Sequence, residues 1–349
     1  MKKLLGIAAL MCSAGAAQAQ SSVTIYGLLD ANVSYNNNGN AAGGNQFKLN
    51  SGGMNTSRFG FRGSEDLGNG LKAVMQLEGG IIMDTGASDG DLFGRQANVG
   101  LQGDFGRVIA GRSYSTEYDF ILPFDPMAYA PQYSWATSAG ATGGRKDGLL
   151  TTASNLIKYQ YDGKGYKLGA TYSFGEVAGN NAANAKYVVA ASVFDGPWAV
   201  VGTYEQNNGA LAANNAYDQA KVSQFAGSYD FGDTKTFLGY RHFKKTLASG
   251  AADQNSDTFW VGANYRLTPE WSLTGAYYYQ TLKNLPVGKN ADPALLSLRA
   301  KYAFSKRTDG YIVGGYAKAK NGLLTGVSRD EPGFAPTQTS FAIGMQHRF

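Results

Sequence analysis

Residues 21–35 read SSVTIYGLLDANVSY, and their side chains alternate between apolar and polar along the chain. The apolar parity holds Val23, Ile25, Leu29, Ala31, Val33 and Tyr35, and the polar parity holds Thr24, Asp30, Asn32 and Ser34. Because successive side chains of a strand point to opposite faces, this stretch predicts a strand with one apolar and one polar face.

The same alternation recurs along the chain, for example in GLKAVMQLEGG (70–80) and GYKLGATYSF (165–174). Tight connections separate such segments at 64–70, 103–106, 162–165, 195–197, 232–234, 268–270 and 305–308. Longer polar stretches lie between them, such as 36–44, 179–186, 207–218, 248–256, 283–292 and 321–337. Seven tight turns and eight longer loops divide the chain into sixteen predicted strands. An even strand number with tight turns at one rim and long loops at the other is typical of bacterial outer-membrane barrels.

A soluble β-sandwich would also alternate, but this chain is one continuous meander with no linker composition. Sixteen strands make a large sheet, which must curl, split or close. Closure removes the sheet edges, and a bilayer requires it because it offers no water to unpaired backbone groups. We therefore predict an all-β fold, a 16-stranded antiparallel transmembrane β-barrel.

The first residues, MKKLLGIAALMCSAGAAQAQ, have the charged, apolar and A-x-A order of a secretory signal, predicted to span 1–19. A lipoprotein reading through Cys12 is the alternative, and bulky Met11 argues against it. Cys12 is the only cysteine, so the predicted mature chain has no thiol, disulfide or Cys-ligated metal.

Removing Lys2 and Lys3 from 31 basic residues leaves 29 against 26 acidic ones, a net charge of about +3. That charge is too small and too dispersed for a nucleic-acid footprint. No mature segment reaches 18 consecutive apolar residues, so strands rather than helices would have to cross a membrane.

One connection, at 114–153, is far longer than the others and carries Pro123, Pro126, Pro131 and several aromatic residues. Loops of this length are usually functional. Inside a wide barrel it would be able to turn inward and narrow the channel.

Several segments together resemble the trimeric general porins of the β-proteobacterial outer membrane. They are SSVTIYGLLDANV (21–33), SRFGFRGSEDLGNGLKAVMQLEGG (57–80), GRQANVGLQGDFGRVIAGR (94–112), SNLIKY (154–159), FSKRTDGYI (304–312) and the terminal GMQHRF (344–349).

The resemblance implies a barrel over 20–349 and a homotrimer in the cell outer membrane, surrounded by membrane lipid and lipopolysaccharide. It also implies that the third loop, 113–153, folds into the lumen as a constriction and that small hydrophilic solutes and anions diffuse through. The last residue, Phe349, is implied to be the signal that the barrel-assembly machinery recognises, on a last strand that closes against the first.

Strand parity and the resemblance together predict the residues of the constriction. Arg58 and Arg62 share one face of their strand, with Phe59 and Phe61 on the other. The predicted basic set is Arg58, Arg62, Lys72, Arg95 and Arg112. The predicted acidic set is Glu78 on the same wall, with Glu117 and Asp119 on the long loop near Asp125. Opposed charges across a narrow opening create a transverse field, which sets ion selectivity.

One position departs from the family pattern. Anion-selective relatives often carry an arginine where this chain has Thr152, while Arg145 and Lys146 lie a few residues earlier. We therefore expect a moderate anion preference.

Other function classes receive little support from the sequence. The mature chain has two histidines, His242 and His347, and no catalytic or metal-binding motif surrounds either of them. We therefore expect no enzymatic activity, no metal site and no cofactor. Calcium at loop carboxylates stays open. The alternative functions are a substrate-selective channel and a barrel-type adhesin, although an adhesin with short loops would lack the long third loop.

Overall fold

The computed structural model describes residues 22–138, 147–284 and 291–349, which form one antiparallel sheet closed into a barrel. The predicted signal peptide, Arg145 and Lys146 lie outside these residues. The strands are β1 (Ser22–Asn36), β2 (Gln46–Ser51), β3 (Arg58–Gly68), β4 (Leu71–Ile82), β5 (Ala87–Ser88), β6 (Gln96–Gly103), β7 (Gly106–Tyr114), β8 (Thr152–Gly163) and β9 (Tyr166–Ser173). They continue with β10 (Lys186–Asp195), β11 (Trp198–Asn208), β12 (Gln219–Asp230), β13 (Thr234–Thr246), β14 (Gln254–Arg266), β15 (Trp271–Lys283), β16 (Ala294–Ala303), β17 (Thr308–Lys318) and β18 (Thr337–Arg348).

Eighteen strands occupy sixteen positions around the barrel. β2 and β3 both pair with β1, one beyond the other, so together they fill one position. β5 is a two-residue extension beside the end of β4, and β4 pairs directly with β6. The ring closes where β1 pairs with β18 over Leu28–Asn36. The predicted closed sixteen-strand barrel is confirmed.

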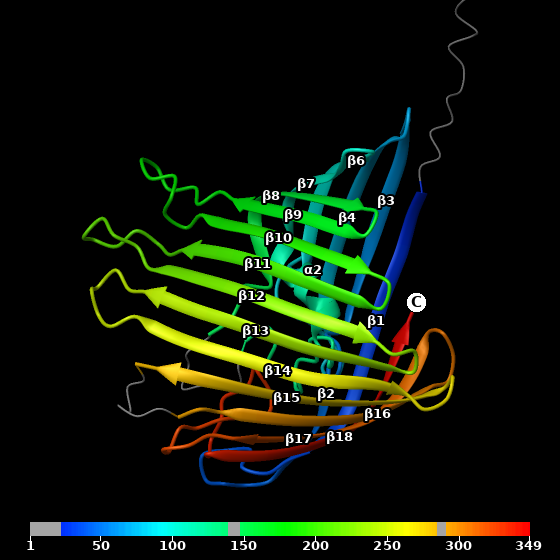
Figure 1. Ribbon diagram of the computed structural model, residues 1–349, viewed down its shortest axis with the longest axis vertical. Coiled ribbons are helices and arrows are strands. Elements are labelled where there is room, and N and C mark those ends of the chain that lie inside the picture. Colours follow the sequence, from blue (N-terminus) through cyan, green and yellow to red (C-terminus); the bar gives the residue numbers. More distant parts are fainter. Residues whose placement is uncertain (1–21, 139–146, 285–290) are drawn as a thin grey trace, which may run out of the picture.

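The two rims of the barrel differ in the length of their connections, as predicted. All seven predicted tight turns join strand pairs at one rim, and the long loops project from the other (Figure 1). Among the described residues no helix is long and apolar enough to cross a membrane.

Alternation decides which side chains face outward. On β1 the polar parity is buried, with Asp30, Asn32 and Ser34 almost fully covered, whereas Val23, Ile25 and Val33 are exposed on the outside. Asp30 shows how the inner polar groups are paired: it accepts hydrogen bonds from the backbone N–H groups of Met54 and Asn55 and from Tyr311 Oη at 2.7–2.9 Å. The outer surface is apolar because it faces lipid, and the inner surface is polar because it faces water.

Aromatic side chains gather toward both rims on the outer surface. Tyr229 and Phe231 lie near the tight-turn rim with ring centroids 4.5 Å apart. Tyr240 and Phe259 lie near the middle of β13 and β14, on the long-loop side of the first pair, with ring centroids 5.0 Å apart. Two such girdles mark the two membrane interfaces of a transmembrane barrel.

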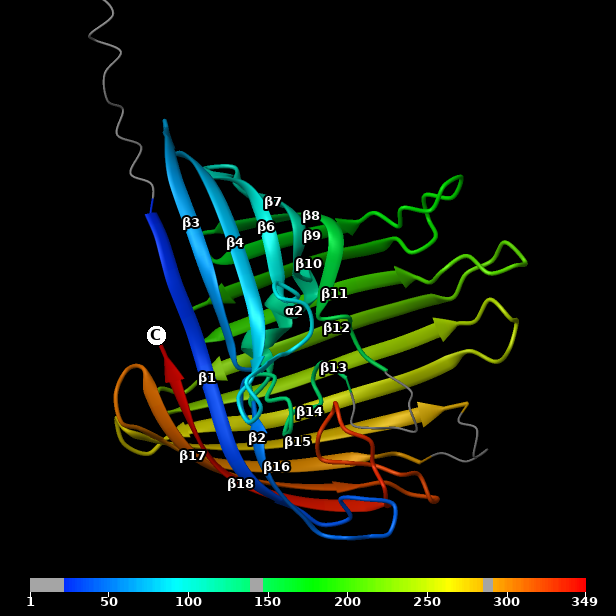
Figure 2. The same cartoon turned by 180° about the vertical axis from the view of Figure 1, so that it is seen from behind.

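The long connection between β7 and β8 lies inside the ring of strands, where Figure 2 shows its short helix. The helix, α2 (Thr116–Ile121), begins after Ser115, whose Oγ accepts a hydrogen bond from the N–H of Tyr118 at 3.1 Å. A 3-10 turn follows at Leu122–Phe124, with Pro123 in its first turn. The serine satisfies a donor that a helix start leaves unpaired, and proline fixes the turn. The predicted inward-folded third loop is confirmed.

Contacts across the lumen hold the loop to the opposite wall. Trp260 Nε1 donates to the carbonyl of Phe124 at 3.0 Å, and Ser297 Oγ donates to the carbonyl of Tyr133 at 2.9 Å. Gly169 on β9 makes room, since a Cβ there would lie 2.6 Å from a carbon of Thr116. These buried hydrogen bonds and close contacts fix the loop as a rigid part of the channel.

Candidate functional site

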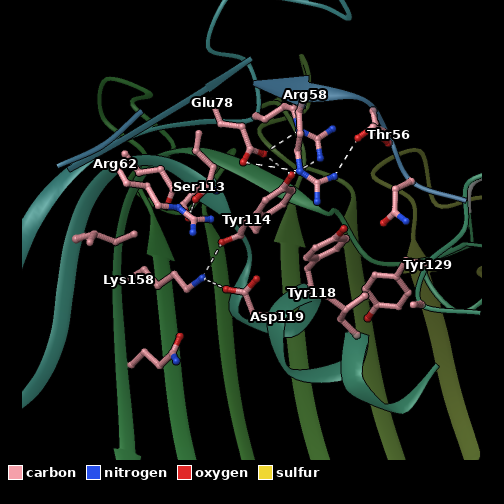
Figure 3. Close-up of a pocket in the computed structure, with 18 of the residues that line it drawn as sticks. Thr56, Arg58, Arg62, Glu78, Ser113, Tyr114, Tyr118, Asp119, Tyr129 and Lys158 are labelled. Atoms are coloured by element: carbon pink, nitrogen blue, oxygen red, sulfur yellow. Dashed lines mark hydrogen bonds and ion pairs between the residues drawn. The ribbon is translucent and has the colours of Figure 1, made fainter. Parts of the chain in front are cut away.

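A cavity of about 310 Å³ lies where the inward loop faces the wall formed by β3, β4, β6, β7 and β8. Its charged lining residues come from the wall, from the loop and from the last long connection (Figure 3). They are Arg58, Arg62, Glu78, Arg95, Arg107, Asp119, Lys158 and Arg329. We call this cavity the constriction site.

Glu78 is the centre of a hydrogen-bonded cluster on the wall. Its Oε1 accepts from Arg95 Nε and from Tyr114 Oη, both at 2.9 Å. Its Oε2 accepts from Tyr26 Oη at 2.7 Å and lies 4.0 Å from Arg58 Nε. Two guanidinium groups therefore face one carboxylate and leave one net positive charge, while the two tyrosine hydroxyls complete the hydrogen bonds of the carboxylate.

Arg62 and Arg107 lie beside this cluster without such a partner. Within the described residues neither forms an ion pair. The Arg62 guanidinium lies 4.0 Å above the ring of Tyr26, a cation–π contact that leaves its charge uncompensated. Both arginines line the constriction site and are available to a passing anion.

The loop side supplies one carboxylate, Asp119, on α2. Its Oδ2 forms an ion pair with Nζ of Lys158 from β8, which also donates to the carbonyl of Tyr114 at 3.1 Å. The ring of Tyr114 stacks on Tyr118, with centroids 4.6 Å apart. This stacking connects β7 of the wall with α2 of the loop.

The charge of the constriction site is strongly positive. Six basic side chains line it against two acidic ones, a net of four positive charges. Charge lining a narrow, low-dielectric opening raises the local concentration of the opposite ion. The arrangement favours anions.

The structure brings five of the predicted residues together and places three elsewhere. Arg58, Arg62, Arg95, Glu78 and Asp119 line the constriction site. By sequence parity Arg95 belongs with the lipid-facing residues of β6, yet its side chain lines the constriction site. The reason is that Arg95 precedes the first residue of β6, so the alternation of that strand does not apply to it.

Lys72 and Arg112 do not line this cavity. Lys72 faces inward, but it lies at the second residue of β4, near the tight-turn rim. Arg112 follows a register shift between Gly111 and Ser113, and its side chain donates to the hydroxyls of Ser154 and Thr152. It lines an adjacent cavity, with Arg95 and Arg329.

Glu117 does not line this cavity either. It lies on the face of α2 that packs against β11 and β12, 0% exposed, and accepts from Thr203 Oγ1 at 3.1 Å and from Gln224 Nε2 at 2.6 Å. Burial, and next the nearby Glu205 carboxylate, raise the pKa of Glu117 well above its ordinary value. Lys186 Nζ lies 3.0 Å from the carboxylate of Glu205.

Asp125, the other carboxylate of the loop, is buried too. It accepts hydrogen bonds from the backbone N–H of Tyr129 at 2.6 Å and from Ser134 Oγ at 2.7 Å. Burial raises its pKa. Its contacts hold the loop's shape and do not reach the channel.

Sequence reasoning missed three basic residues of the constriction site. Lys158 and Arg107 had a signal, since each alternates with apolar neighbours, as in LIKYQY (156–161). Arg329 had none, because it comes from an irregular connection and reaches the carbonyl of Tyr129 at 3.0 Å only through the fold. Where the chain is described, no group of three or more His, Cys, Asp or Glu side chains is placed to hold a metal ion.

Comparison with known proteins adds three findings. The family model described as "Gram-negative porin" matches residues 6–322. Outer membrane porin proteins of Bordetella pertussis and Delftia acidovorans are 31% and 32% identical to this chain, with the whole of both sequences covered in each case.

Solved structures match over nearly the full length. An anion-selective porin from Comamonas acidovorans superimposes with a TM-score of 0.81 at 26% identity, covering 95% of this chain and 100% of that one. An outer membrane protein of Vibrio cholerae, in its trimer form, matches with a TM-score of 0.71 at 19% identity, covering 94% and 99%, and shares the fold.

Proposed function

The chain belongs to the Gram-negative porin family and forms an outer-membrane channel, and from that premise we propose that the channel prefers anions. The observation that carries the proposal is the excess of six basic over two acidic side chains at the constriction site. The anion-selective porin of similar structure supports the same direction.

Transport through such a site needs no conformational cycle. The loop narrows the lumen, and its contacts with Ser340, Val327 and Trp260 keep it in place. A small anion leaves bulk water, meets Arg62 and Arg107, and moves on because no single group encloses it. Multiple weak sites favour entry and release together.

The preference is moderate. Thr152 bears no charge where anion-selective relatives often carry arginine, and its hydroxyl accepts from Arg112 at 3.3 Å. Glu78 and Asp119 further reduce the field, each within an ion pair.

The chain acts without catalysis or a cofactor in this proposal. Its two histidines lie apart, His242 beside Asp257 and His347 beside Thr308. The porin names of its relatives describe channels.

Assembly follows the family pattern in the same proposal. The signal peptide 1–19 is removed, the mature chain 20–349 forms a homotrimer among outer-membrane lipid and lipopolysaccharide, and the barrel-assembly machinery recognises Phe349. Two backbone hydrogen bonds of 3.1 Å join Phe349 to Gly27, so the last residue completes the closure of the barrel.

One measurement tests the selectivity. The purified protein is inserted into a planar bilayer under a KCl gradient, and the reversal potential is read in dilute and in concentrated salt. We expect the sign of anion preference in dilute salt and a weaker preference at high salt, because ions screen the lining charges. A reversal potential of the sign expected for cation selectivity would refute the proposal. If the channel passed one solute and excluded others of the same size, the substrate-selective alternative would be favoured instead.

A further inference from the structure

A second cavity, of about 230 Å³, lies in the lumen between the inward loop and the tight-turn rim. Its wall residues stand at the tight-turn ends of β9 to β13, among them Phe194 and Lys235, and Phe120 and Pro123 close it on the loop side. Asp119 lines both this cavity and the constriction site, so a solute leaving one enters the other directly. We call it the aromatic cavity.

Phe194 is an exposed aromatic side chain on the inner face of the barrel. On β10 the inward positions include Val188 and Ser192, which are buried, whereas Val189 faces outward. Phe194 shares the inward parity and lines the aromatic cavity, yet it is 39% exposed. The exposed side chain of Pro123 lines the same cavity. An apolar surface open to a water-filled lumen offers an aromatic solute a place to stack.

Strand register sets the space beside the Phe194 ring. Phe194 lies opposite Ala199 on β11, and Ala199 lies opposite Ser228 on β12, all three on the inner face. Two interstrand spacings separate Phe194 from Ser228, about 10 Å. The short side chain of Ala199 leaves the space between them open. That space suits one six-membered ring with a short polar substituent.

The far end of this space carries hydrogen-bond donors. Ser228 lies opposite Phe237, and the Nζ of Lys235, two residues earlier on β13, lies 5.4 Å from the centroid of the Phe237 ring. In the described part of the chain Lys235 forms no ion pair and the Ser228 hydroxyl forms no hydrogen bond. Asp230 lies opposite Lys235, but its Oδ1 accepts from the N–H of Gly232 at 2.8 Å. An ammonium and a hydroxyl together suit a carboxylate.

The other charged groups of the aromatic cavity already have partners. Lys167 pairs with Asp162 at 3.0 Å, and Asp119 pairs with Lys158. Lys235 is therefore the charge that remains for a solute, and it selects an anion.

We propose that the aromatic cavity binds aromatic monocarboxylates, with the ring against Phe194 and over Ala199 and the carboxylate at Lys235 and Ser228. Mostly apolar walls with a few placed polar groups are the usual make-up of a small-molecule site. The inference rests on the proposed anion preference, since the solute first crosses the constriction site, and it names a solute class that the channel retains in passing. The site binds weakly and releases the solute toward the tight-turn rim.

Single-channel recordings of the full-length protein in a planar bilayer test the proposal, with benzoate at pH 7 as the probe. Benzoate should interrupt the KCl current, and the concentration dependence of the interruptions gives an apparent Kd. Acetate, which lacks the ring, and benzyl alcohol, which lacks the charge, should both interrupt it weakly.

Four variants assign the two ends of the site and its floor. Phe194→Ala should raise the Kd for benzoate about fivefold, and Phe194→Tyr should preserve it. Ala199→Leu fills the floor and should weaken binding with both ends intact. Lys235→Gln should also raise the Kd. Its matched control, Lys72→Gln, removes an inward positive charge near the same rim but outside the cavity, and should bind benzoate as the unchanged protein does.

Equal interruption by benzoate and acetate, or one Kd for the unchanged protein, Phe194→Ala and Ala199→Leu, refutes the proposal. Equal effects of Lys235→Gln and Lys72→Gln would reduce the binding to a general charge effect and also refute it. The KCl reversal potential of the unchanged protein separates this inference from the anion preference. An anion-selective potential without benzoate interruptions overturns the aromatic cavity alone, whereas a cation-selective potential with Phe194-dependent interruptions supports the cavity and overturns the preference.

Discussion

Arg62→Glu is the sharpest test of how the constriction site selects ions. Arg62 is exposed to the lumen, lines the constriction site and forms no ion pair with a described residue. Its replacement changes the lining from six basic and two acidic groups to five and three, and the net charge from four to two. The neutral control Arg62→Gln should produce about half the effect.

The size of the effect follows from Coulomb's law. At about 6 Å, two unit charges in a water-like dielectric interact by about 0.7 kcal/mol. A change of two charges is then worth about 1.4 kcal/mol for each passing ion, a factor of about ten in partition. Screening reduces this beyond a Debye length of ~10 Å at 0.1 M salt and nearly removes it at 1 M.

The assay is the reversal potential in a planar bilayer, in dilute and in 1 M KCl. Lys72→Glu is the matched control, since it makes the same charge change on the same inner face but near the tight-turn rim. We expect a large shift toward cations for Arg62→Glu in dilute salt and a small one for Lys72→Glu. Equal shifts for the two variants would refute the assignment of Arg62 to the selective region.

Four other perturbations test the loop, the closure and the field. Deleting 120–136 removes the loop segment from the lumen, so single-channel conductance should rise and larger sugars should pass; unchanged conductance would contradict the inward loop. Deleting Phe349 removes the hydrogen bonds to Gly27 and should lower the yield of heat-modifiable trimer, and normal yield would show that closure does not need it. Thr152→Arg should move the reversal potential toward anions, and no movement would place position 152 outside the ion path. Because the pKa of Glu117 is raised, its contact with β11 and β12 is fully formed below the ordinary carboxyl pKa and weakens as pH rises through the raised pKa. The current noise of the channel should therefore grow with pH, and Glu117→Gln should abolish that growth. Identical noise-against-pH profiles for the variant and the unchanged protein would exclude this carboxyl as the cause.

Much of the constriction wall was predictable because strand parity is local. Arg58 and Arg62 alternate with Phe59 and Phe61, so the lumen-facing set followed from neighbouring residues alone. Arg112 shows the limit of that reasoning. A register shift beside it, which no residue pattern announces, moved its side chain from the expected site.

The loop side was not predictable in the same way. Asp119 and Glu117 are two residues apart, and a strand would have pointed them in one direction. In α2 they diverge, so that Asp119 reaches Lys158 and Glu117 is buried against Thr203 and Gln224. The helical period of 3.6 residues replaced the strand period of 2.

The sequence by itself determined the sixteen strands, their two faces, the tight and long rims and the long third loop, because each depends on residues adjacent in the chain. The tertiary structure decided which charges meet across the lumen. Arg329 joins the constriction site from the far end of the chain, and Asp119 pairs with Lys158 only because the loop folds inward. Contacts between distant segments depend on barrel closure and loop packing, and no local period carries that information.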